Sequence, residues 1–83
     1  MDTRLAVVAI VVENEESVGA LNELLHTFSM YIIGRMGVPY PKRNVSLISV
    51  AIDAPTDVIN NLSGKLGKIA GVTSKVAYSK TPE

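Results

Sequence analysis

The chain has 83 residues, 47% of them hydrophobic, and its eight basic side chains balance its eight acidic ones. A neutral chain without a basic run lacks the electrostatic footprint of a nucleic-acid binder, so we expect no direct contact with nucleic acid. Cysteine is absent, which excludes disulfides and thiolate metal sites and is typical of a protein of the reducing cytoplasm.

The first predicted element is the apolar run "LAVVAIVV" at residues 5–12. An unbroken run of β-branched and apolar residues predicts a strand buried on both faces. The run is far shorter than the roughly 20 residues that cross a bilayer. It also lacks the flanks of a signal peptide. We therefore expect a cytoplasmic protein that does not associate with membranes.

A helix is predicted from about residue 15 to 28. Asn14 is a good N-cap, and Glu15 and Glu16 suit the positive end of a helix. Apolar residues at helical spacing then form one stripe: Val18, Leu21, Leu24, Leu25 and Phe28.

Two strands joined by a turn are predicted next. The stretch "YIIGRMGVPY" (31–40) has Met30 before it and is the second strand, and "YPKRN" (40–44) has the residues of a turn. The third strand is 45–52. Its alternation points Ile48, Val50 and Ile52 toward the helices, and the opposite face holds Leu47, Ser49 and Ala51.

A second helix begins at 53–55 and is predicted to end at Gly71, and 72–79 is the last strand. The order β-α-β-β-α-β, with short connections and right-handed crossovers, favours one arrangement. It is an α+β, ferredoxin-like fold with a four-stranded antiparallel sheet (order 4-1-3-2) and both helices on one face. We expect residues 1–83 to form a single domain of this kind.

The sheet face away from the helices should be apolar, because the first strand is apolar in both phases. A contiguous apolar surface usually marks an interface. We therefore expect a homo-oligomer, a dimer or a pair of dimers. The residues expected at the interface are Tyr31, Ile33, Gly37, Leu47 and Ala51.

Within the second strand, simple alternation divides the residues between two faces. One face would hold Arg35 with Tyr31, Ile33 and Gly37, and the other would hold Ile32, Gly34, Met36 and Val38. A charge should avoid the core, so Arg35 is expected on the open face or at the sheet margin. There it would bind a carboxylate or phosphate, or pair with a neighbouring subunit.

The catalytic inventory is poor. His26 is the only histidine and should be exposed on the first helix, so neither a triad nor an intrachain histidine metal site is expected. Glu13, Glu15 and Glu16 form either a solvated helix start or, with Asn14, a loop that grips a small ligand or a cation. We expect no enzyme activity, no metal and no cofactor.

The second helix carries "SGKLG" (63–67), which lacks the upstream glycine of a phosphate loop. Gly64 and Gly67 fall on the helix face away from the core. They indicate either a close approach by another molecule or loose final turns.

Several longer stretches resemble a known family: "RLAVVAIVVEN", "LNELLHTFSMYIIGRMGVPY", "SLISVAIDAPTDVINNLSGKLGKIAGV" and "KVAYSK". They are similar to a small bacterial family of regulators of the iron-only (FeFe) hydrogenase system over about residues 4 to 80. The most specific stretches are "GRMGVPY" and "DAP-DVI---SGKLG". The resemblance implies a ferredoxin-like, oligomer-forming sensor domain associated with hydrogenase maturation.

More distantly, the chain resembles ACT-type modules and the C-terminal domain of the nickel-responsive repressor. The repressor's ligand histidines would fall near Ser29, Gly37 and Pro39, none of which can supply imidazole, so the likeness does not imply a nickel site. In ACT-type modules the effector lies near the first strand–helix loop, which corresponds to about residues 13–19 here. Gly19 matches the module's glycine, but the Asp-Arg-Pro before it is absent.

Two functions follow as hypotheses. The preferred one is a non-catalytic, homo-oligomeric regulatory domain that binds a small effector at a subunit interface. The alternative is a protein–protein adaptor or assembly factor for hydrogenase maturation without a small-molecule ligand, which would meet a hydrogenase-related partner. The candidate ligand contacts are Glu13, Asn14, Arg35, Met36, Tyr40 and Gly64.

Overall fold

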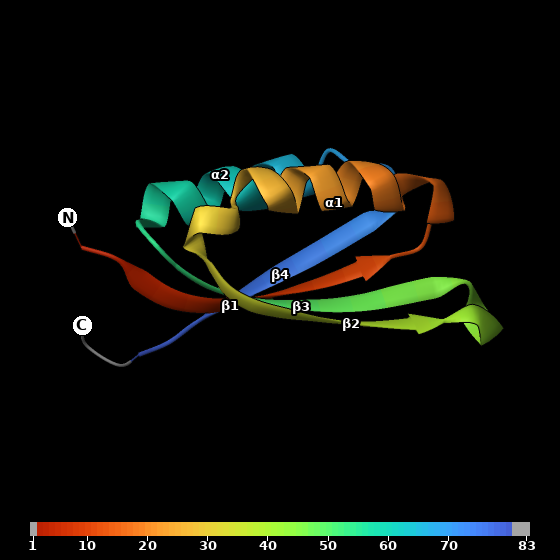
Figure 1. The fold of residues 1–83 in the computed structure, drawn as a ribbon, viewed down its shortest axis with the longest axis horizontal. Helices are drawn as coiled ribbons and strands as arrows, with labels where there is room; N and C mark the ends of the chain where they lie inside the picture. The colour runs from red at the N-terminus through yellow and green to blue at the C-terminus, as the bar shows by residue number, and fades with distance from the viewer. Residues whose placement is uncertain (1, 81–83) are drawn as a thin grey trace.

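The computed structural model describes residues 2–80 and contains four strands, two α-helices and three single-turn 3-10 helices (Figure 1). In chain order these are β1 (Arg4–Val12), η1 (Glu15–Ser17), α1 (Val18–Thr27), η2 (Ser29–Tyr31), β2 (Ile32–Tyr40), η3 (Pro41–Arg43), β3 (Val45–Ala54), α2 (Thr56–Leu66) and β4 (Val72–Tyr78).

The strands form one sheet in the order β2-β3-β1-β4, and each neighbouring pair is antiparallel. Figure 1 shows α1 and α2 side by side over one face of this sheet. Read from the other edge, the strand order is the predicted 4-1-3-2. The predicted ferredoxin-like α+β fold is therefore confirmed.

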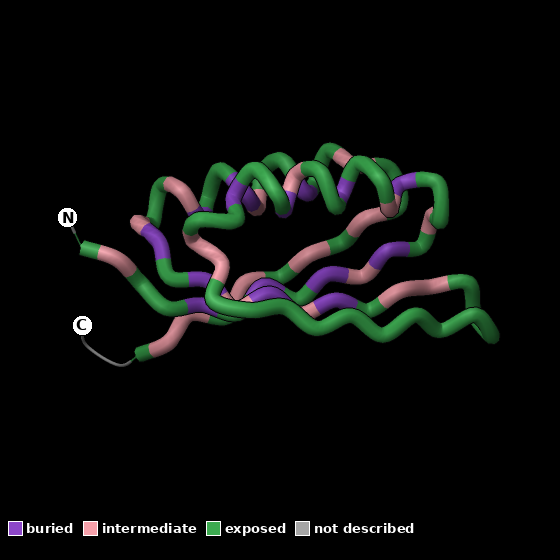
Figure 2. Tube along the Cα trace, viewed as in Figure 1, coloured by how far each residue is buried: buried purple, intermediate pink, exposed green. Residues whose placement is uncertain are grey.

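The core lies between the helices and the covered face of the sheet. Every second residue of β1 is buried there, from Ala6 to Val12, and each is paired with an inward-facing residue of β3. Leu21 and Leu25 of α1 pack against this layer, as do three residues of α2: Ile59, Leu62 and Leu66. Figure 2 shows the alternation along β1 and β3 and the buried undersides of both helices. The inward positions predicted for the third strand, Ile48, Val50 and Ile52, are confirmed.

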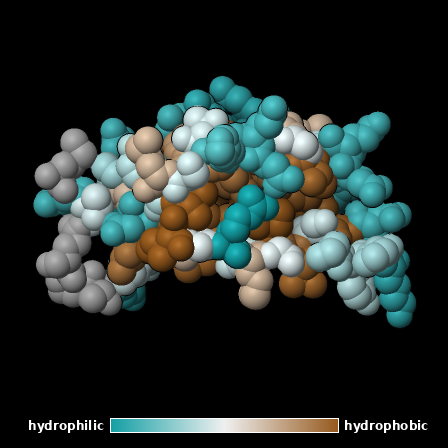
Figure 3. Space-filling view, viewed as in Figure 1, coloured by the Kyte–Doolittle hydropathy of each residue, from teal (hydrophilic) through white to brown (hydrophobic). Residues whose placement is uncertain are grey.

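The other face of the sheet, called here the open face, is covered by nothing within the described chain. Its β1 and β3 positions include Leu5 and Val7, each 44% exposed, and Leu47, 48% exposed. On the same face, β2 contributes Met36 and Val38, which are 67% and 50% exposed. Figure 3, which views the sheet along its edge, shows hydrophobic side chains in the band between the helices and the sheet and in several places along the lower margin, whereas the outer surface of the helices is mainly hydrophilic.

A β-bulge in β2 overturns the predicted division of this strand between two faces. Ile32 pairs with Ile52 and Gly34 with Ala51, so Ile33 is an extra residue that shifts the alternation by one. Arg35 consequently pairs with the buried Val50 and lies on the helix side, still exposed at the sheet margin.

Gly37 moves to the helix side with Arg35, opposite Ile48, whereas Met36 and Val38 move to the open face. The predicted grouping of Ile33 with Arg35 and Gly37 is therefore wrong. Tyr31 does not belong to the strand at all. It ends η2 and is half-buried against the core.

The second helix is shorter than predicted. α2 ends at Leu66, with Gly67 as its C-cap, rather than at Gly71. Gly71 instead occupies the left-handed region, with φ of 72°, in the turn before β4. A Cβ atom added there would lie 2.6 Å from Asn14 Cβ, so only glycine fits this approach of the two loops.

We predict that Gly71→Ala destabilises the protein by about 1–3 kcal/mol, because alanine combines an unfavourable φ with the clash against Asn14. Gly64→Ala is the matched control. Gly64 lies inside α2, and an added Cβ there would have no neighbour within 4 Å. This control should stabilise the protein by up to about 1 kcal/mol. Urea unfolding measures both changes, and equal effects of the two substitutions would contradict the close approach at Gly71.

Candidate functional site

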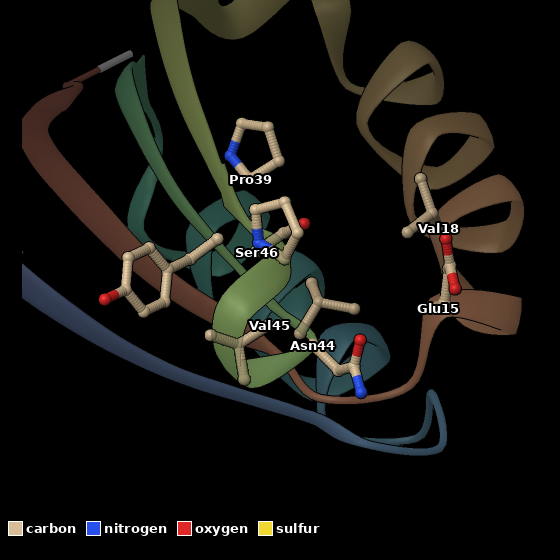
Figure 4. A pocket seen from close by; sticks show the side chains of 9 residues that line it. Glu15, Val18, Pro39, Asn44, Val45 and Ser46 are labelled. Atoms are coloured by element: carbon tan, nitrogen blue, oxygen red, sulfur yellow. The ribbon is translucent and has the colours of Figure 1, made fainter.

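A small cleft opens at the end of the sheet where β1 ends and the β2–β3 turn lies. The cleft has a volume of about 140 Å³. It is lined by Val12, Glu15, Val18, Pro39, Tyr40, Pro41, Asn44, Val45 and Ser46. Figure 4 shows Glu15 and Val18 on the helix side and Pro39, Asn44 and Ser46 on the hairpin side, with the opening between them.

The hairpin wall of the cleft is shaped by its turn residues. Pro41 begins η3, where its missing N–H does no harm, and Asn44 ends the turn in the left-handed region with φ of 55°. The Asn44 N–H donates to the carbonyl of Pro41 at 3.2 Å. This turn presents the Asn44 amide and the Ser46 hydroxyl on one side of the cleft.

The helix wall is held by contacts between two loops. The Glu13 N–H donates to the Gly71 carbonyl at 2.7 Å, and the Ser17 hydroxyl donates to the Ala70 carbonyl at 2.6 Å. Asn14 Oδ1 accepts a hydrogen bond from the Glu16 N–H at 3.1 Å, as the N-cap prediction requires. These bonds fix the turn from which Glu15 reaches the cleft.

The cleft offers both polar and apolar contacts. Glu15 supplies a carboxylate, Asn44 an amide and Ser46 a hydroxyl, while the valines and prolines supply apolar wall. Typical ligand pockets measure about 300–1,000 Å³, so about 140 Å³ from one subunit is roughly half a pocket or less. The arrangement suits recognition of a small polar molecule if a second surface completes the wall.

The structure does not bring the six candidate ligand residues into one place. Tyr40 lines the cleft, and Glu13 and Asn14 lie in the loop next to it. The Glu13 N–H and the Asn14 side chain are used in hydrogen bonds that hold this loop, to Gly71 and Glu16 respectively. Met36 projects on the open face. Arg35 lies in a different hollow between α1 and β2, and Gly64 lies on the exposed side of α2.

Sequence reasoning missed Asn44 and Ser46 as cleft residues. Part of the signal lies in the sequence, because Pro41 and Asn44 predict a turn that follows Tyr40. What was missing is the position of this turn, which the antiparallel pairing of β2 and β3 places opposite the start of α1.

The inventory of reactive groups in the described chain is small. Among residues 2–80, no three His, Cys, Asp or Glu side chains are grouped as a metal site would require. His26 is exposed on α1, as predicted. In the same part of the chain no helix is long and apolar enough to cross a membrane.

The fold and the cleft define a class, namely ferredoxin-like α+β domains with one uncovered sheet face. A formyltetrahydrofolate deformylase from Pseudomonas putida KT2440 contains a similar fold, with a TM-score of 0.58 and 15% identity over 92% of this chain. The match covers only 28% of the deformylase, and at this identity it shows the fold alone.

The family is shown by two closer matches. Residues 4–76 match the model of the TM1266-like family, described as "Iron-only hydrogenase system regulator, putative". The solved structure of the uncharacterized protein TM1266 from Thermotoga maritima is 39% identical, with a TM-score of 0.91, and the match covers 95% of this chain and all of that one. No curated protein matches the sequence. The chain belongs to the TM1266-like family.

We predict that Ser17→Ala loosens the helix wall of the cleft. Ser17 is 8% exposed, and removing its hydroxyl leaves the Ala70 carbonyl without this bond, which should cost about 1–2 kcal/mol of unfolding free energy. Hydrogen exchange at the Glu13 amide should also become faster. Ser63→Ala, a half-buried serine of α2, is the control and should leave that amide unchanged. Unchanged exchange at Glu13 in Ser17→Ala would contradict the loop contact.

Proposed function

We propose that this chain is a cytoplasmic, non-catalytic regulatory domain that assembles with copies of itself through the open face and binds a small effector where subunits meet. The observation that carries the proposal is the open face, a largely apolar surface on one side of a small sheet. Membership in a family of hydrogenase-system regulators supports a regulatory rather than an enzymatic role.

A second copy of the chain is the occupant that best suits the open face. The charged strand positions on this face are Asp53 of β3, opposite Leu5, and Lys75 of β4, opposite Ala9. They are opposite in sign and the whole chain is neutral, so net charge does not oppose the pairing of two copies. An 83-residue domain also has a thin stability margin, which burial of this face would increase. Ile33, Leu47 and Ala51 of the expected interface lie on this face, whereas Tyr31 and Gly37 do not.

The cleft adjoins the proposed interface through Tyr40. Tyr40 lines the cleft, and its pairing with Val45 directs its side chain to the open face, where it is 45% exposed. A neighbouring subunit on the open face would therefore meet the rim of the cleft and could supply the wall that one chain lacks. Effector binding and assembly would then be coupled.

We predict that Leu47→Glu converts the assembly to monomer. The substitution places a charge in the open face, where one subunit alone leaves Leu47 48% exposed, so the subunit fold should persist. Asn60→Glu, on the exposed side of α2, is the control and should keep the assembly. Sedimentation velocity at micromolar concentration distinguishes the two. A monomeric parent protein would contradict the proposal at once.

We predict that a thermal-shift screen of amino acids, nucleotides and metal ions finds at least one stabilising ligand. A ligand at a hundredfold excess over its dissociation constant stabilises by about 2.7 kcal/mol. Glu15→Gln should abolish the shift if the ligand lies in the cleft, whereas Glu16→Gln, beside it but outside the lining, should not. A flat response across the panel would favour the adaptor function over the sensor.

A further inference from the structure

Arg35 points to the helix side of the sheet, where it contacts α1. Its Nη2 group donates to Asn22 Oδ1 of α1 at 3.0 Å, so the guanidinium bridges the strand and the helix. This direction depends on the bulge at Ile33, without which alternation would aim Arg35 at the open face. Bulges often serve to re-aim a side chain at a functional site.

The guanidinium lines a hollow of about 290 Å³ between α1 and β2. The hollow, called here the Arg35 hollow, is lined by Asn22, Leu25, His26, Ser29, Ile32 and Arg35. Its cationic and hydrogen-bonding groups come from three separate elements, namely β2, α1 and η2. Apolar surface from Leu25 and Ile32 lies beside them.

The donors of this hollow exceed its internal acceptors. A guanidinium carries five N–H donors, and the contact with Asn22 occupies one of the two on Nη2. Within residues 2–80 no carboxylate forms an ion pair with Arg35. His26 and Ser29 add a ring N–H and a hydroxyl on the same hollow. These donors suit an anion with several acceptor oxygens.

We infer that the Arg35 hollow binds the phosphate group of a small phosphorylated molecule. Arginine binds two oxygens of one phosphate through its fork, and the remaining terminal oxygen can accept from His26 or Ser29. A carboxylate offers only two oxygens and would leave one donor group unused. The apolar surface of Leu25 and Ile32 is available to the rest of the molecule.

This site goes beyond the proposed effector cleft and does not depend on assembly. Arg35 and the open-face residues lie on opposite faces of the sheet, so a subunit on the open face leaves the Arg35 hollow accessible. Failure of assembly would not abolish phosphate binding, and failure of phosphate binding would not abolish assembly.

One carboxylate weakens the site from nearby. Glu23 lies beside Asn22 on α1 and lines an adjoining hollow with His26 and Thr27. Its charge repels an anion held by His26. Removing that charge should therefore tighten phosphate binding, which provides a variant that gains rather than loses affinity.

The test is an NMR titration of the ¹⁵N-labelled protein with inorganic phosphate, with sodium chloride and sodium acetate at matched ionic strength as comparison salts. We expect saturable shifts at Asn22, His26, Ser29 and Arg35 with phosphate. Arg35→Gln should raise the dissociation constant about tenfold or more, because it removes a charged hydrogen-bond donor. Arg35→Lys, which keeps the charge without the fork, should weaken binding less.

Two further variants complete the design. Arg43→Gln, in the exposed turn η3, removes the same charge elsewhere and should leave the dissociation constant unchanged. Glu23→Gln should lower it severalfold. Equal saturable binding of acetate would replace the phosphate assignment by a general carboxylate site. Shifts that do not saturate, or an unchanged constant in Arg35→Gln with its spectrum otherwise intact, would overturn the site.

Discussion

The structure depends on β1, a central strand whose two faces are both apolar. Paired on one side with β3 and on the other with β4, it supplies four buried residues to the core and four apolar residues to the open face. Two short helices can cover only one side of a four-stranded sheet. Because β1 is apolar on both faces, the face opposite the helices is left as an apolar surface that the described chain does not cover. The proposed self-association through this surface would remove it from water.

The bulge at Ile33 gives β2 its two roles. It sends Met36 and Val38 to the open face, where they extend the apolar surface, and Arg35 to the helix side, where it meets Asn22. The glycines of "YIIGRMGVPY" are tolerated because β2 is an edge strand, and Pro39 is tolerated for the same reason. One added residue thus divides this strand between the proposed assembly surface and the proposed phosphate site.

The elements, their order and the inward face of β3 could be predicted from the sequence, because apolar periodicity and turn residues determine them locally. The face of Arg35 could not, since a bulge arises from pairing with β3 and leaves no local pattern. The sequence predicts the end of α2 too late, at Gly71 instead of Leu66, for a similar reason. The left-handed Gly71 reflects the approach of the Asn14 loop, a contact distant in sequence.

Of the six candidate ligand residues, Glu13, Asn14 and Tyr40 lie together at or beside the cleft because they flank two turns that the fold juxtaposes. Arg35, Met36 and Gly64 lie elsewhere, because their chemistry alone does not determine where the fold places them.

If a second copy of the chain covers the open face, contacts between subunits must involve the side chains of that face. Isotope-filtered NMR on a mixture of labelled and unlabelled chains observes only contacts between subunits, and methyl groups of Val7, Leu47 and Met36 report on the face directly. We expect intermolecular contacts among these methyls. Intermolecular contacts confined to the outer surfaces of α1 and α2, or none at all, would contradict it.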